Sequence, residues 1–158
     1  ISVAQFNHTD VELRNTLPND PQVNQQWAFF NTDTTGASNA VGISAQKAWD
    51  LTTSGTTVQG DQLVVAVVDG GFDVNHEDIN YWTNSGEIAG NGLDDDNNGY
   101  IDDVNGWNAY SNSGAMTSDS HGTHVDGTVA AKGNNSIGVT GVNWNAQVMA
   151  IQGSSGIE

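Results

Sequence analysis

The sequence of 158 residues predicts an α/β fold built on a doubly wound parallel sheet. Two strongly apolar runs, Leu63–Val68 and Ala146–Ile151, are typical of parallel strands. A segment with helical character, His121–Lys132, stands between them. Because strands that alternate with helices form parallel sheets, these three segments indicate the fold class.

The elements before the sheet are short. Residues 1–17 alternate loosely between apolar and polar side chains, which predicts a strand that ends before Pro18 and Pro21. Apolar residues at helical spacing predict a short helix between Gly42 and Thr53.

The first apolar run, Leu63–Val68, has six apolar residues, four of them β-branched, and predicts a fully buried strand. Asp69 follows it and is therefore expected at the carboxyl end of that strand. Residues 80–114 form a long loop rich in Gly, Asn and Asp, interrupted by a short strand within 104–109. Loops of this length usually carry a function. Residues 134–145 are predicted as loop and Ala146–Ile151 as a second buried strand.

The composition narrows the possible partners. Three Lys and Arg against 19 Asp and Glu give a formal net charge of −16, which disfavours nucleic acid and anionic membrane surfaces as partners. Many carboxylates and amide oxygens suit a hard divalent cation, and Ca²⁺ is the expected cofactor. The absence of cysteine excludes disulfides, thiolate zinc sites and a cysteine nucleophile. No apolar run reaches the length of a membrane span, and we expect a secreted protein whose signal peptide has been removed.

Four blocks in a fixed order carry a resemblance to a known family. They are Val65–Phe72 (VAVVDGGF), Asn75–Ile79 (NHEDI), His121–Ala131 (HGTHVDGTVAA) and Asn134–Val142 (NNSIGVTGV). Together they resemble the subtilisin-like serine proteases (the subtilases, peptidase family S8), over about residues 18–158. The resemblance implies a subtilisin-like sheet that is incomplete in this chain, and a serine endopeptidase that acts on polypeptides.

Asp69 and His121 are the catalytic residues that the resemblance implies. A hydroxyl nucleophile needs a neutral imidazole to accept its proton, and the imidazole needs a carboxylate to fix its tautomer. His121 would act as general base and then as general acid, while Asp69 orients it. The Ser and the oxyanion-hole Asn are expected beyond Glu158, on a carboxy-terminal fragment that would be a partner of this chain. The remaining histidines (His8, His76 and His124) are left out of the site.

The resemblance also implies boundaries within the chain. Residues 1–17 resemble the tail of a propeptide, and residues 18–158 the amino-terminal part of the catalytic domain. The chain departs from the family pattern at Gly70, Glu77, Asp126 and Asn143–Trp144. Asp126 matters most, because a carboxylate in the histidine block is expected to favour the protonated form of His121.

Two calcium sites are expected. Asp94–Asp103 (DDDNNGYIDD) has oxygen-bearing residues at positions 1, 3, 5 and 9 and Gly at position 6 of a calcium-loop pattern. Position 12 is Asn105 and not Glu, so the loop is not a true EF-hand. The expected ligands are Asp94, Asp96, Asn98, the Tyr100 carbonyl, and Asp102 or Asp103.

The second site is implied by the resemblance alone. Its side-chain ligands would be Asp20, Asp78 and Asn135. Its carbonyl ligands would be Gly133, Ile137 and Val139.

Two other functions are compatible with these residues. One is a non-catalytic subtilase fragment or pseudoprotease, which Gly70 and Asp126 favour. The other is a calcium-dependent binding module, whose partner binding would survive replacement of His121.

Overall fold

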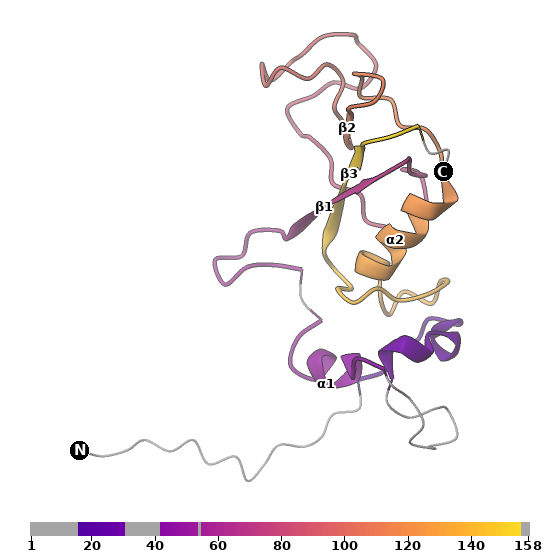
Figure 1. Cartoon of the computed structure of the whole chain (residues 1–158). Coiled ribbons are helices and arrows are strands. Elements are labelled where there is room, and N and C mark those ends of the chain that lie inside the picture. The colour runs from indigo at the N-terminus through magenta and orange to yellow at the C-terminus, as the bar shows by residue number, and fades with distance from the viewer. Residues whose placement is uncertain (1–15, 31–41, 54, 156–158) are drawn as a thin grey trace, which may run out of the picture.

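A three-stranded parallel sheet forms the centre of the computed structural model, which describes residues 16–30, 42–53 and 55–155 (Figure 1). Its strands are β1 (Val64–Asp69), β2 (Gly106–Asn108) and β3 (Gln147–Gln152), in the order β1-β3-β2. In this register Asp69 and Asn108 both pair with Gln152. The carboxyl ends of all three strands therefore lie side by side at the same end of the sheet.

Helix α2 (Ser120–Ala130) connects β2 to β3 and packs against β1 and β3. This arrangement is the incomplete α/β fold that the sequence predicts. Helix α1 covers only Ala45–Trp49 of the predicted segment, and it starts after Ser44, whose φ is 57°. Two 3-10 turns, η1 (Val23–Gln25) and η2 (Trp27–Phe29), lie where the sequence predicts no element. Most of the strand predicted within residues 1–17, His8 included, lies outside the described residues.

The prediction that β1 is fully buried is wrong. Val64 is 38% and Val68 is 68% exposed, and only Val67 has a buried side chain among the valines of β1. The reason is the strand order: β3 occupies the centre, and β1 lies at the edge of the sheet within the described part of the chain. An apolar run predicts a strand, but it does not predict which strand is central.

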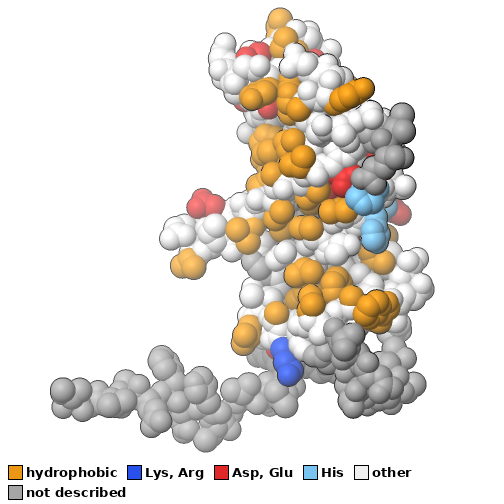
Figure 2. Space-filling view, viewed as in Figure 1, with side chains coloured by type: hydrophobic (Ala, Val, Ile, Leu, Met, Phe, Trp, Pro, Cys, Tyr) orange, Lys and Arg blue, Asp and Glu red, His pale blue; other side chains and the backbone are white. Residues whose placement is uncertain are grey.

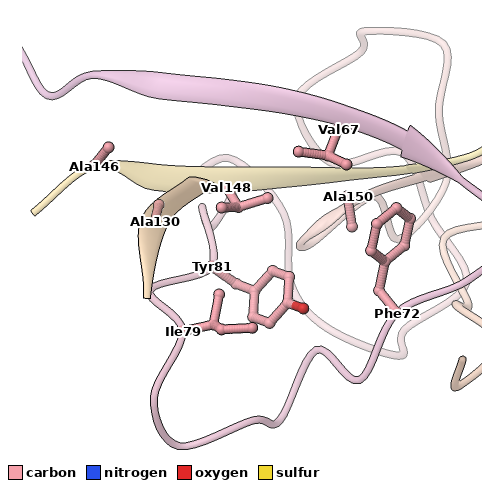
Figure 3. Close-up of a cluster of buried hydrophobic side chains, with 8 residues drawn as sticks. All are labelled: Val67, Phe72, Ile79, Tyr81, Ala130, Ala146, Val148 and Ala150. Carbon is pink, nitrogen blue, oxygen red and sulfur yellow. The ribbon is translucent and has the colours of Figure 1, made fainter. Parts of the chain in front are cut away.

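Two apolar clusters hold the fold together. In the first, Tyr81 forms a parallel bridge with Val148 of β3, so that the segment after β1 returns along the sheet, and the side chains of Ile79 and Tyr81 lie beside Val148 (Figure 3). Full burial of each such large apolar side chain contributes about 1.5–3 kcal/mol. The first cluster comprises Val67, Phe72, Ile79, Tyr81, Ala130, Ala146, Val148 and Ala150.

The second cluster ties the amino-terminal part of the described chain to the loop before β3. Phe29, Trp49 and Trp144 are buried together, and the Trp49 and Trp144 ring centroids are 5.2 Å apart. Trp49 Nε1 donates to the Val142 carbonyl at 2.9 Å.

The helices of the described residues are too short or too polar to span a membrane.

Candidate active site

Asp69 is the last residue of β1 and lies at the end of the sheet where the carboxyl ends of the strands meet. Its side chain is 15% exposed, and its Oδ1 accepts a hydrogen bond from the Gly70 backbone N–H at 2.7 Å. Gly71 follows, and a Cβ at that position would overlap the Thr117 carbonyl of the segment that leads into α2. The glycine therefore lets the two backbones approach next to Asp69.

The first turn of α2 carries His121. Asp119 caps the helix by accepting a hydrogen bond from the His121 backbone N–H at 2.7 Å, an arrangement that fixes where the helix begins. A Cβ at Gly122 would overlap the Gly71 carbonyl and lie 3.1 Å from the Asp69 Cβ. The helix can therefore lie directly against the end of β1, one residue after His121.

These two local structures bring Asp69 and His121 together across 52 positions of the chain. His121 Nδ1 lies 2.9 Å from Asp69 Oδ2 and 3.0 Å from Oδ1, while 68% of the His121 side chain is exposed. Figure 2 shows histidine side chains on one side of the molecule, next to acidic ones.

The pKa of Asp69 is the net result of opposing effects. Partial burial raises the pKa, but the hydrogen bonds from His121 and Gly70 lower it by more than burial raises it, so the pKa lies below its usual value. The dyad combines an ionised carboxylate with an accessible imidazole.

The carboxyl end of β3 also anchors the loop that leads to His121. Gln152 is 1% exposed, and its Oε1 accepts from the Thr117 backbone N–H at 2.9 Å and from Asn108 Nδ2 at 2.8 Å. One buried amide therefore connects the ends of β2 and β3 to the segment before α2.

A cavity of about 540 Å³ lies along the outer side of α2. His76 and His124 both line it, while Asp69 and His121 do not. His76 Nδ1 accepts from the Asp78 backbone N–H at 3.3 Å. Neither histidine joins the dyad.

The loop after α2 folds around two buried carboxylates. Asp20 accepts from the backbone N–H groups of Asn134 and Asn135 at 2.8 and 3.0 Å. Asp78 accepts from Asn135 Nδ2 at 2.8 Å and from the Val139 N–H at 3.1 Å. Both carboxylates are 2% exposed. The structure thus brings Asp20, Asp78 and Asn135 together, in the loop that also contains the backbones of Gly133, Ile137 and Val139.

A second acidic group forms within the long loop. Three carboxylate oxygens, one each from Glu87, Asp96 and Asp103, lie within 4.8 Å of one another. Asn84 Nδ2 donates to Asp96 at 2.9 Å and to Asp103 at 2.8 Å, and Asn98 Nδ2 donates to both at 3.2 and 3.1 Å. Rotation of either amide by 180° would present its oxygen to the same centre, with loss of the hydrogen bond that this oxygen accepts from the backbone N–H of Gly86 or Tyr100. This set of oxygen donors fits a hard divalent cation.

The other predicted ligands of this loop lie around that group. Asp94 accepts from the backbone N–H groups of Asn98 and Gly99, at 3.0 and 2.9 Å. Asp102, whose φ is 55°, accepts from the N–H groups of Asn91 and Gly92 at 3.2 and 3.1 Å. The Tyr100 ring packs against Trp107 with centroids 4.8 Å apart. In the structure, Asp94 and Asp102 are engaged in the turns of the loop, while Asp96 and Asp103 form its acidic centre with Glu87.

Comparison with known proteins identifies the family. Residues 60–157, well over half of the chain, match the Subtilase family (Peptidase_S8). This chain belongs to the subtilase family. It is 37% identical over 147 residues to subtilisin-like protease 1 of Plasmodium berghei, covering 90% of this chain and 24% of that protein.

A second relative and a solved structure are also similar to this subtilase. An extracellular protease of Xanthomonas campestris pv. campestris is 36% identical over 161 residues, covering 94% of this chain and 25% of the relative. A solved protease structure from Pseudoalteromonas arctica has a TM-score of 0.53 and 30% identity, covering 89% of this chain and 40% of that one. The subtilase chain therefore spans about a quarter of the length of these two curated relatives.

Glu87 is the residue of this subtilase that the sequence analysis missed. An EF-hand pattern places a carboxylate at position 12, which is Asn105 here. In the structure, Glu87 brings a carboxylate from the opposite direction, seven positions before Asp94. Its Oε1 and Oε2 accept from the Asp95 and Asp102 backbone N–H groups at 2.9 and 3.1 Å. The Gly-Glu pair within an Asn-rich loop was the available signal.

Proposed function

We propose that this chain supplies the Asp and the His of an Asp-His-Ser triad in a serine endopeptidase that hydrolyses polypeptides. The observation that supports it is the 2.9 Å approach of His121 Nδ1 to Asp69 Oδ2 at the carboxyl end of a parallel sheet. Residues 18–158 would form the amino-terminal part of the catalytic domain. The Ser and the oxyanion-hole Asn would lie on a carboxy-terminal part of the same protease, outside these 158 residues.

The geometry indicates the role of each group. Asp69 accepts the Nδ1 proton of His121, which fixes the tautomer that has its basic lone pair on Nε2. Nε2 is then the atom that takes the proton of the Ser hydroxyl and returns it to the leaving amine. Because its pKa is lowered, Asp69 stays ionised at neutral pH and stabilises the imidazolium that forms between these steps.

A fluorophosphonate probe tests this proposal on the longer protease that contains the chain. The probe labels only an activated serine, so the parent protein should be labelled and Asp69→Asn should slow labelling by about 10⁴-fold. His121→Ala should abolish labelling. His76→Asn is the matched control, because this exposed histidine lies outside the dyad and Asn keeps an acceptor for the Asp78 N–H.

Two outcomes would contradict the proposal. Labelling that persists in His121→Ala would show that this imidazole is not the base. An unlabelled parent protein that still binds calcium would favour the non-catalytic alternative, in which the chain acts as a calcium-dependent binding module.

We propose Ca²⁺ as the cofactor, bound at both acidic loops and with no part in the chemical step. Asp20, Asp78 and Asn135 would hold one ion together with the carbonyls of Gly133, Ile137 and Val139. Glu87, Asp96, Asn98 and Asp103 would hold the second, near the Tyr100 carbonyl. Asp94 and Asp102 would shape that loop through their hydrogen bonds to backbone N–H groups. Oxygen-only donor sets and buried carboxylates support both assignments.

Terbium binding tests the second calcium site, because Trp107 packs on Tyr100 and can sensitise lanthanide luminescence. Glu87→Gln should weaken terbium and calcium binding at least tenfold. Asp95→Asn is the matched control: it removes the same charge from the same loop, but Asp95 lies outside the three-carboxylate group. Equal affinities in the two variants would remove Glu87 from the proposed site.

We also propose that the protease is secreted. Two relatives, from Xanthomonas campestris pv. campestris and Dichelobacter nodosus, are named as extracellular proteases. Calcium sites that depend on millimolar ion concentrations suit the extracellular medium. The expected partners are a polypeptide substrate and the Ser-bearing part of the protease, with no role for nucleic acid or membranes.

A further inference from the structure

The inward face of α2 carries a carboxylate close to the dyad. Gly122, Asp126 and Ala130 are the buried residues of this helix, and their spacing of four places them on one face. Gly122 contacts the end of β1 beside the Asp69 Cβ. Asp126 lies one turn further along the same face and is 0% exposed.

Asp126 has a single hydrogen-bond partner among the described residues. Its Oδ2 accepts from the Tyr81 hydroxyl at 2.8 Å, and its buried Oδ1 accepts none. No lysine of the described chain compensates its charge, since Lys132 donates to the Glu77 carbonyl and Lys47 lies on α1. A neutral hydroxyl therefore provides the only hydrogen bond that the structure offers to this carboxylate.

The groups around Asp126 disfavour its charge. Burial raises the pKa of Asp126 to about 7, the Tyr81 hydrogen bond opposes this, and the negative charge of Asp69 raises it further. The charge of Asp69 acts on Asp126 from the end of β1, and Tyr81 acts on it from the segment that follows, where Asp73 acts electrostatically on Tyr81. His121, in the first turn of α2, is paired with Asp69. The adjacent part of β3 contributes Val148 and Ala150, which carry no charge.

We propose that Asp126 is a positioning residue that sets the proton affinity of His121 from inside the core, through the charge that it gains and loses beneath the Asp69–His121 pair. This inference rests on the proposed function of the dyad. When Asp126 is ionised, its charge adds to that of Asp69, which contacts the imidazole, and both charges favour the imidazolium. When Asp126 is protonated, Asp69 alone does so, and His121 retains its neutral, basic form to lower pH.

The titrations of the two groups are therefore coupled. As the pH falls, Asp126 takes up a proton and loses the charge that would otherwise help to protonate His121. As the pH rises, Asp126 becomes ionised and stabilises the imidazolium of the reaction. Tyr81 takes part in this coupling, because its hydroxyl donates the hydrogen bond that stabilises the ionised form of Asp126.

NMR titration of histidine ring protons in the longer protease that contains the chain tests the proposal, and its readout does not depend on peptidase activity. In Asp126→Asn the titration midpoint of His121 should move to lower pH by about half a unit. Asp61→Asn removes the same charge from an exposed site at the opposite end of β1 and should leave the midpoint in place.

Tyr81→Phe extends the test. Removal of the hydroxyl should move the His121 midpoint in the same direction as Asp126→Asn, and adding Tyr81→Phe to Asp126→Asn should produce no further shift. An unchanged His121 midpoint in folded Asp126→Asn would overturn the proposal.

If Asp126→Asn does not fold, the ¹³C carboxyl signal of Asp126 in the parent chain decides. An Asp126 carboxyl titration that also shows the midpoint of His121 supports the coupling. A carboxyl titration with one midpoint, different from that of His121, overturns it. Failure of fluorophosphonate labelling would contradict the proposed function but leave these titrations unaffected.

Discussion

Asp69 is partly exposed and Asp126 is fully buried, and their environments move their pKa values in opposite directions. Hydrogen bonds from His121 and Gly70 outweigh the burial of Asp69, while burial dominates at Asp126. Asp69 therefore stabilises the fold above the unfolded pKa, near 3.9, and loses that contribution as the pH falls through its lower folded value. Asp126 does the reverse: its burial costs stability as the pH rises from about 4 to above 7.

Asp126→Asn should accordingly change how stability depends on pH. Between pH 5 and pH 8 the parent chain should lose on the order of 2 kcal/mol relative to Asp126→Asn, because only the parent must ionise a buried carboxyl. Urea unfolding at the two pH values, with Asp61→Asn as the exposed control, measures this change. Parallel pH profiles of the parent and Asp126→Asn would contradict it.

The sequence predicts the contact between Asp69 and His121, but it does not predict the contact between Asp126 and Tyr81. The motif blocks identify Asp69 and His121, and the structure brings the two side chains into contact. The sequence also shows that Asp126 is unusual, but not that Tyr81, 45 positions earlier, provides its hydrogen bond. That contact depends on how the segment after β1 returns beneath α2, which no local pattern encodes.

Among the elements, α2 depends on a glycine at its first turn. The close approach of α2 to β1 leaves no room for a side chain at Gly122, whereas a Cβ at Gly127 would meet no atom within 4 Å. Two glycines of one helix should therefore respond in opposite ways to the same substitution.

Gly122→Ala should lower the free energy of unfolding by about 1–3 kcal/mol, because the helix must move away from β1. Gly127→Ala should raise it by about 0.5–1 kcal/mol, because alanine favours the helix and causes no clash. Thermal and urea unfolding of both variants checks the pair. A Gly122→Ala chain as stable as Gly127→Ala would show that α2 is not packed tightly against β1.

Element types were easier to predict than element environments. The strands β1 and β3 and the helix α2 lie where the apolar patterns predict them, with ends that differ by a few residues. The burial of β1 was predicted wrongly because composition cannot distinguish an edge strand from a central one. Glu87 was missed because its approach to Asp96 and Asp103 is created by the fold of the loop.

The whole molecule carries a formal net charge of −16, and the proposed calcium sites lie where carboxylates gather most closely. Self-repulsion of this size opposes the compact state, and bound divalent cations would reduce it. The site at Asp20 and Asp78 would also tie the amino-terminal part of the described chain to the loop after α2.

Chelation of calcium should lower the melting temperature by about 5–10 °C, since one site filled at a hundred times its dissociation constant contributes about 2.7 kcal/mol. Added NaCl should restore part of the loss through screening. Asp20→Asn should melt at lower temperature than the parent in calcium and respond less to chelation. A melting temperature that chelation does not change would remove both proposed sites.

The last strand of the described chain is also the central one, and this order has a consequence for synthesis on the ribosome. Until Gln147–Gln152 has been made, β1 and β2 have no neighbour with which to form the observed ladder. The nascent protein must therefore hold both strands unpaired while about forty further residues are added between β2 and β3. Because β3 completes the ladder, the contact between Asp69 and His121 should form only after Gln152 has been made, and the Ser that we propose to lie beyond Glu158 would be made later still.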